Sequence, residues 1–154
     1  MVALEQEGRL FRHVQEIPAP REGNERFIWL TVAARDWYRN PGKEFKQASF
    51  AMAIQQMDAF IRGARLFEGE DVKHLDPKHR EVWEIRTVLE RPQIRLFGWF
   101  PCQMHFVFVH AKSRDDLEPH RGPKWDRAIN KVVTTRAELL LPAYGGFSFS
   151  DYVG

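Results

Sequence analysis

Short runs of apolar and β-branched residues, separated by polar turn-forming residues, recur along this chain. Three of them lie at residues 82–88, 94–100 and 104–111, and an earlier one lies at residues 27–32. Runs of this length and composition are typical of β-strands. The connections between the last three are short and contain proline, so these strands are predicted to form an antiparallel meander.

A longer stretch, residues 43–66, spaces its apolar residues along one broad helix face. Asn40-Pro41-Gly42 precedes it, and these residues suit a helix cap and first turn. Gly63 indicates the end of this helix, although a chain break inside the stretch would make it a helical hairpin. A second helix is predicted at residues 124–140, where Gly122-Pro123 opens the helix and a later proline stops it.

These elements predict an α+β fold. An antiparallel sheet of three to five strands would be covered on one side by a long N-terminal helix or helical hairpin and by a C-terminal helix. The length of 154 residues suggests a single domain. Residues 1–25 are predicted to be an irregular arm with room for one short strand, residues 26–141 the core, and residues 142–154 a tail. The tail would form an edge strand or dock on the core.

The composition narrows the class of protein. Apolar residues make up 44% of the chain, which favours a packed core over disorder. The one cysteine, Cys102, cannot form an internal disulfide, and this favours a reducing compartment. The chain has no apolar run of the length that crosses a bilayer, and residues 1–12 lack the apolar part of a secretory signal. We therefore expect a cytoplasmic protein that does not enter a membrane.

The charge is unevenly distributed. The net charge is only +2, but residues 81–136 hold ten lysines and arginines against seven acidic residues. A local positive excess of this size permits binding of a polyanion without requiring it.

The order of motifs from residue 72 to residue 138 resembles the RelE/HigB superfamily of small toxin ribonucleases, and especially its phage-related HigB-like branch. The resemblance extends over roughly residues 27–140. His110 stands where the family usually has an aromatic residue, and Ser113 stands where it has the second lysine of a pair. The motifs that carry the resemblance are Val72-Lys73-His74-Leu75, Val82-Trp83-Glu84-Ile85-Arg86, Gln93-Ile94-Arg95-Leu96-Phe97 and Phe106-Val107-Phe108-Val109-His110-Ala111-Lys112, followed by a helix that contains Ala128.

This resemblance implies an endoribonuclease toxin of a type II toxin–antitoxin system. Such a protein cleaves messenger RNA, either free or bound to the ribosome, and is held by a cognate antitoxin. The implied reaction uses neither metal nor cofactor, because a ribose 2′-hydroxyl attacks the neighbouring phosphate. Arg and Lys suit stabilisation of the phosphate charge, and His suits proton transfer near neutral pH.

Side chains alternate between the two faces of a strand, so the candidates can be sorted by face. His110 and Lys112 are two residues apart and share a face, whereas His105 and His110 are five apart and should lie on opposite faces. The predicted catalytic residues are Arg86, Arg95, His110 and Lys112. The predicted RNA-binding residues are Arg114, Lys124, Lys131 and Trp99.

Each candidate also has a structural interpretation. Arg86 could simply pair with Glu84 or Glu81, and Trp99 could be a core residue. Lys124 and Lys131 could belong to a solvated helix face. No motif for a zinc or phosphate-loop site is present, and the His74–His79 segment is a poor metal site. The missing second lysine, the low net charge and the terminal arms favour an alternative function, that of a non-catalytic RelE-like phage or prophage accessory or structural protein that binds nucleic acid or a protein partner.

Overall fold

A six-stranded mixed sheet forms the centre of the fold, with the strand order β1-β2-β6-β5-β4-β3. The computed structural model describes residues 1–15, 19–42, 45–89, 91–119, 122–146 and 148–153. Neighbouring strands are antiparallel except β2 and β6, which are parallel. The strands are β1 (Leu10–Arg12), β2 (Phe27–Thr31), β3 (Val72–His74), β4 (Trp83–Arg86), β5 (Ile94–Cys102) and β6 (His105–Ser113).

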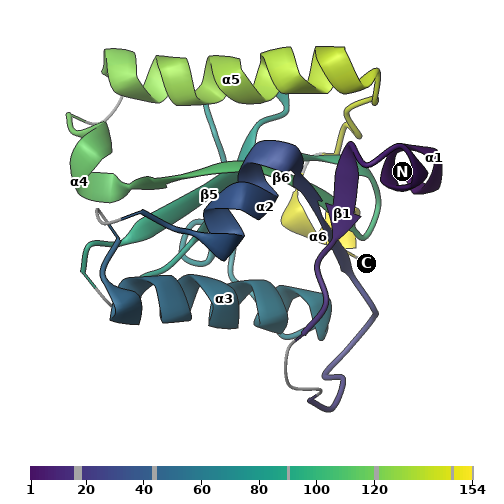
Figure 1. The fold of residues 1–154 in the computed structure, drawn as a ribbon, viewed down its shortest axis with the longest axis horizontal. Helices are drawn as coiled ribbons and strands as arrows, with labels where there is room; N and C mark the ends of the chain where they lie inside the picture. The colour runs from purple at the N-terminus through teal and green to yellow at the C-terminus, as the bar shows by residue number, and fades with distance from the viewer. Residues whose placement is uncertain (16–18, 43–44, 90, 120–121, 147, 154) are drawn as a thin grey trace.

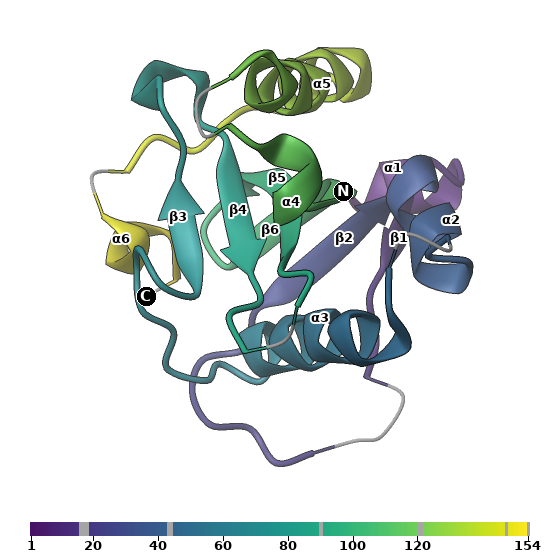
Figure 2. The ribbon, with the colours of Figure 1, turned by 90° about the vertical axis from the view of Figure 1, so that its left-hand side faces the viewer.

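Helices cover both faces of this sheet, so the expectation that they pack on one side is wrong. In Figures 1 and 2, α5 and α3 lie on opposite sides of the strands. Two separate groups of buried apolar residues fill the two sides, one with α2, α3 and α6 and the other with α1, α4 and α5. The described helices are α1 (Val2–Gln6), α2 (Val32–Arg39), α3 (Gln47–Ile61), the 3₁₀ turn η1 (Lys78–Arg80), α4 (Arg114–Leu117), α5 (Pro123–Leu139) and α6 (Phe149–Val153).

The fold is α+β, as the sequence predicts, and β4, β5 and β6 form the predicted antiparallel meander. The sheet as a whole is larger than expected and is mixed rather than antiparallel. Its two edge strands, β1 and β3, contain three residues each, which is too short to produce a recognisable alternation. None of the helices in the described part has the length and apolar character needed to cross a bilayer.

The long N-terminal helix expected at residues 43–66 is not found. The helix α3 has 15 residues, from Gln47 to Ile61, and the expected start at Lys43 lies outside the described residues. Gly63, with φ of +77°, follows the helix end in the left-handed conformation that glycine tolerates. The separate helix α2 begins directly after β2, where the Thr31 hydroxyl accepts a hydrogen bond from the Ala34 amide and caps it.

The terminal segments are part of the fold. In the N-terminal segment expected to be an arm, β1 pairs with β2, and Leu4 and Leu10 are buried in the core on the α5 side. The C-terminal tail docks as the short helix α6. Its Tyr152 is fully buried and donates a hydrogen bond to the Glu81 carboxylate at 2.8 Å.

An irregularity between β5 and β6 changes which side chains face α5. Phe97 pairs with His110, but the next residue, Gly98, pairs with Phe108, so β6 carries one extra residue at this point. A Cβ atom at Gly98 would lie 2.1 Å from the Val107 carbonyl oxygen, so a side chain cannot be accommodated there. The extra residue reverses the alternation along β6.

Candidate functional site: a basic pocket beside the α5 helix

The four predicted catalytic residues lie on the same face of the sheet, the face covered by α5. Arg86, Arg95 and Lys112 are direct partners across β4, β5 and β6, so they form one row. His110 belongs to the next row, opposite Phe97. Directly paired residues on neighbouring strands project to the same side, so the strand pairing brings the four together on one face as expected.

Arg95 is nevertheless buried and already bonded. It is 2% exposed, and its guanidinium donates to the Thr87 carbonyl at 3.1 Å and to the Gln93 side chain at 3.0 Å. Its Nε lies 3.7 Å from Oε2 of Glu84, which is 1% exposed. Burial lowers the pKa of Arg95 to about 10, against the opposing effect of Glu84.

Arg86 belongs to the same ion-pair group. Its Nε lies 3.5 Å from Oε1 of Glu84, and its guanidinium donates a hydrogen bond to the Gly69 carbonyl. Burial raises the pKa of Glu84, while Arg95 and Arg86 oppose that rise. We call Glu84, Arg86 and Arg95 the Glu84 cluster. Its cations neutralise a buried carboxylate, so the arrangement is that of a structural cluster.

The other half of the predicted site opens into a pocket of about 450 Å³ between β6, α4 and α5. We call it the basic pocket. Among the residues that the structure describes, none of its four cations forms an ion pair, and Asp116 is the one carboxylate in its lining. The lining residues are His110, Lys112, Asp116, Leu117, Lys124, Arg127, Ala128 and Lys131.

The α5 helix supplies three of these cations because of its spacing. Lys124, Arg127 and Lys131 are three and four residues apart, so they follow one side of the helix. All three are exposed, while the alternate positions Trp125 and Ile129 are buried against the sheet. The apolar stripe that docks α5 therefore also fixes the direction of its basic side.

His110 forms the inner wall of the basic pocket. It is 6% exposed, stacks on the Phe97 ring with centroids 5.0 Å apart, and places Nε2 3.0 Å from the Ala128 carbonyl oxygen. Because a carbonyl only accepts, Nε2 must carry the proton and Nδ1 must be the unprotonated nitrogen. Nδ1 is covered and has no hydrogen-bond partner in the described part of the chain.

The His110 imidazole is neutral near pH 7. Burial lowers its pKa to about 4, and the nearby Lys131 and Lys112 act in the same direction. A neutral imidazole with a bare Nδ1 can accept a proton or a hydrogen bond. It cannot serve as a cation for phosphate.

The four predicted RNA-binding residues lie in three different places. Lys124 and Lys131 line the basic pocket. Arg114 lines a neighbouring pocket of about 250 Å³ and pairs with Glu118 at 3.5 Å. Trp99 is fully buried and donates to the Pro142 carbonyl, so it is a core residue and offers no ring to a base.

The sequence predicts that His105 and His110 lie on opposite faces of the sheet. This prediction is wrong because β6 carries one extra residue between them. His105 accepts a hydrogen bond from the Trp29 indole at 2.9 Å, and Trp29 belongs to the core on the α5 side, as does the Phe97 ring beneath His110. Both histidines therefore face α5, although they contact different partners. In the described ranges no group of three or more His, Cys, Asp or Glu side chains is placed to hold a metal ion.

Sequence reasoning missed two residues of the pocket, Arg127 and Asp116. Arg127 could have been found, since it lies three residues after Lys124 and four before Lys131 on a predicted helix. Asp116 had no such signal, because α4 has only four residues and follows the strand directly.

Comparison with protein-family models, curated proteins and solved structures finds no significant match. The fold and the site thus define an α+β protein with a basic pocket at one side of its sheet.

Proposed function

We propose that this protein binds RNA and that the basic pocket holds a phosphate of the RNA backbone. The observation that carries the proposal is the set of four cations, Lys112, Lys124, Arg127 and Lys131, that surround one pocket and form no ion pair with any described residue. These cations give up water but no ion pair when a phosphate binds, whereas the arginines of the Glu84 cluster would have to leave a buried carboxylate. The choice of RNA as the polyanion comes from the resemblance to the RelE/HigB superfamily.

Backbone phosphates bound in this way make affinity depend on salt, because bound counterions are released. The test measures fluorescence anisotropy of a labelled single-stranded RNA of about 12 nucleotides at several salt concentrations. We expect Lys112→Gln/Lys131→Gln to weaken binding by roughly tenfold and to lower the log–log salt slope by about 1.

The matched control is Lys46→Gln/Arg65→Gln, which removes the same charge at exposed positions that do not line the basic pocket. It should leave binding within about twofold of the unchanged protein. Equal weakening by both double variants would mean that net charge, and not the pocket, determines binding.

A second candidate function is the metal-independent endoribonuclease activity of a toxin with a cognate antitoxin. The observation that favours it is the bare Nδ1 of neutral His110 beside four phosphate-binding cations. In that reaction Nδ1 would take the proton of a ribose 2′-hydroxyl, and Lys112 with its neighbours would stabilise the charge on the phosphate. Because Nδ1 is covered, side chains of the pocket must move before a hydroxyl can reach it.

Cleavage and binding are separated by His110→Phe, which installs the aromatic residue usual in the family. If His110 is the base, cleavage of RNA in buffer with a chelator falls by roughly 100-fold or more while RNA affinity is unchanged. Intact messenger RNA and normal growth after induced expression in bacteria would leave RNA binding without cleavage, which is the non-catalytic alternative.

A further inference from the structure

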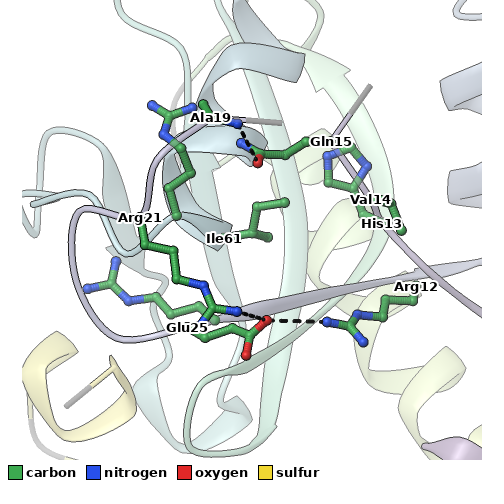
Figure 3. A pocket seen from close by; sticks show the side chains of 10 residues that line it. Arg12, His13, Val14, Gln15, Ala19, Arg21, Glu25 and Ile61 are labelled. Atoms are coloured by element: carbon green, nitrogen blue, oxygen red, sulfur yellow. Dashed lines mark hydrogen bonds and ion pairs between the residues drawn. The ribbon is translucent and has the colours of Figure 1, made fainter. Parts of the chain in front are cut away.

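A second pocket, of about 230 Å³, is lined by residues 12–15, by residues from 19 to 26 and by the C-terminal end of α3 (Figure 3). We call it the arginine pocket. It shares no lining residue with the basic pocket, and the only carboxylate among its described lining residues is that of Glu25. Its basic lining residues are Arg12, His13, Arg21, Arg26 and Arg62.

Backbone contacts fix the wall of the arginine pocket. The Gly23 amide donates to the Arg62 carbonyl at 3.2 Å, and the Arg26 amide donates to the Ile61 carbonyl at 3.4 Å. A Cβ atom on Gly23 would lie 2.6 Å from the carbonyl oxygen of Gly63, so the two chain segments touch through their backbones. These contacts hold residues 23–26 against the C-terminal end of α3.

In the described structure, the three outer arginines of this pocket, Arg12, Arg21 and Arg62, pair with two carboxylates. Arg12 and Arg21 both reach Oε1 of Glu25, at 3.5 and 2.8 Å (Figure 3). Arg62 lies 3.0 Å from Glu22. The acidic partners in these pairs are at least one-third exposed, and ion pairs of this kind are weak, so an incoming anion can replace or join a carboxylate.

Arg26 is the most deeply buried arginine in the lining of this pocket. It is 8% exposed and donates a hydrogen bond from Nη1 to the Ala64 carbonyl at 3.0 Å. Its guanidinium lies over the Phe60 ring, and its Nε has no hydrogen-bond partner in the part of the chain that the structure describes. No ion pair joins Arg26 to any acidic residue that the structure describes. A buried guanidinium without a counter-charge is costly, and a bound anion would remove that cost.

We propose that the arginine pocket binds a phosphate group, carried either by a small phosphorylated compound or by the terminal phosphate of an RNA. Within the described ranges, Arg12, Arg21 and Arg62 pair with two carboxylates, Glu25 and Glu22, and Arg26 adds a fourth guanidinium, so the positive excess suits a phosphate monoester dianion. Guanidinium groups bind phosphate oxygens through paired, charge-assisted hydrogen bonds. This site is separate from the proposed RNA-backbone site.

The test is isothermal titration calorimetry of the full chain with inorganic phosphate at low ionic strength. We expect saturable binding to the unchanged protein and to Lys112→Gln/Lys131→Gln, and at least tenfold weaker binding to Arg26→Gln. The lysine variant separates this proposal from the proposed function, because it disables only the basic pocket.

Circular dichroism shows whether Arg26→Gln folds. If it does not, Arg21→Gln/Arg62→Gln replaces it, and phosphate affinity should fall several-fold because both changes are at more exposed positions. Absence of phosphate binding to the unchanged protein, or unchanged binding in the folded arginine variants, would overturn the proposal.

The source of the phosphate is resolved with RNA that carries a 5′-phosphate or a 5′-hydroxyl, titrated into Lys112→Gln/Lys131→Gln. If the phosphorylated RNA binds more tightly, and this preference disappears when Arg26→Gln is added to the double variant, the site binds an RNA end. Equal binding of the two RNAs, with inorganic phosphate still bound, assigns it to a free phosphorylated compound.

Discussion

Two groups of cations occupy the same face of the sheet and differ in almost every physical property. The Glu84 cluster holds Arg95 at 2% exposure around a buried carboxylate, whereas the basic pocket holds Lys112, the direct strand partner of Arg95, exposed and unpaired in the described structure. One strand spacing therefore separates a buried cation with a partner from an exposed cation without one.

The difference teaches that a shared face does not make a shared site. Arg95 and Lys112 are close because the strands pair, but burial and the position of Glu84 decide which of them can bind a ligand. A buried cation that compensates a buried carboxylate supports the fold, while an exposed cation in a pocket is available for an anion. Changes to the two groups should therefore affect different measurements.

The largest effect is expected from Glu84→Ala. It leaves Arg95 buried without its counter-charge, so the free energy of unfolding should fall by about 3–5 kcal/mol. Urea denaturation followed by circular dichroism measures this change. The double variant Glu84→Leu/Arg95→Met replaces the pair with apolar groups and should recover much of the loss. A double variant as unstable as the sum of its single changes would show that the pair is not coupled.

A smaller effect is expected from pH acting on His110. Its folded-state pKa of about 4 lies below the ordinary value of about 6.5, so the unfolded chain binds a proton that the folded chain excludes. Stability is therefore complete above about pH 6.5 and falls by roughly 3 kcal/mol as pH drops through the folded pKa.

The variant His110→Phe isolates this effect, because the other titrating groups stay in place. The difference in unfolding free energy between the unchanged protein and the variant should change by roughly 3 kcal/mol between about pH 6.5 and pH 4. A difference that stays constant over this range would mean that His110 titrates normally and that the pocket wall is open to water.

The sequence predicts the meander from its short connections, and it predicts that His110 and Lys112 share a face, because strand alternation is a local property. It does not predict how deeply each candidate is buried. That depends on where α5 packs against the sheet and on which arginines lie beside Glu84. It also assigns His105 to the wrong face, because the extra residue opposite Gly98 is set by pairing between strands. Arg127 is the exception, since helix spacing alone would have placed it beside Lys124.

Binding measurements separate the two cation groups directly. Lys112→Gln and Arg86→Gln remove one positive charge each from the same cross-strand row, on either side of Arg95. We expect Lys112→Gln to weaken RNA binding roughly threefold and to leave stability nearly unchanged. Arg86→Gln should leave RNA affinity unchanged and lower stability by about 1–2 kcal/mol, because Glu84 loses a partner. The opposite pattern in anisotropy and urea denaturation would reverse the assignment of the two groups.

The smallest effect tests the one acidic side chain that lines the described basic pocket. Asp116→Asn removes its negative charge, so RNA affinity should rise by roughly two- to fivefold, and the gain should shrink as salt screens it. Asp115→Asn is the matched control, since the same charge is removed one residue away, in the neighbouring pocket with Arg114. If both variants bind RNA more tightly and to the same extent, the effect comes from the net charge of the whole protein and not from the pocket. A gain confined to Asp116→Asn places the bound phosphate among Lys112, Lys124, Arg127 and Lys131, because a field that distinguishes adjacent carboxylates must act within a few ångströms.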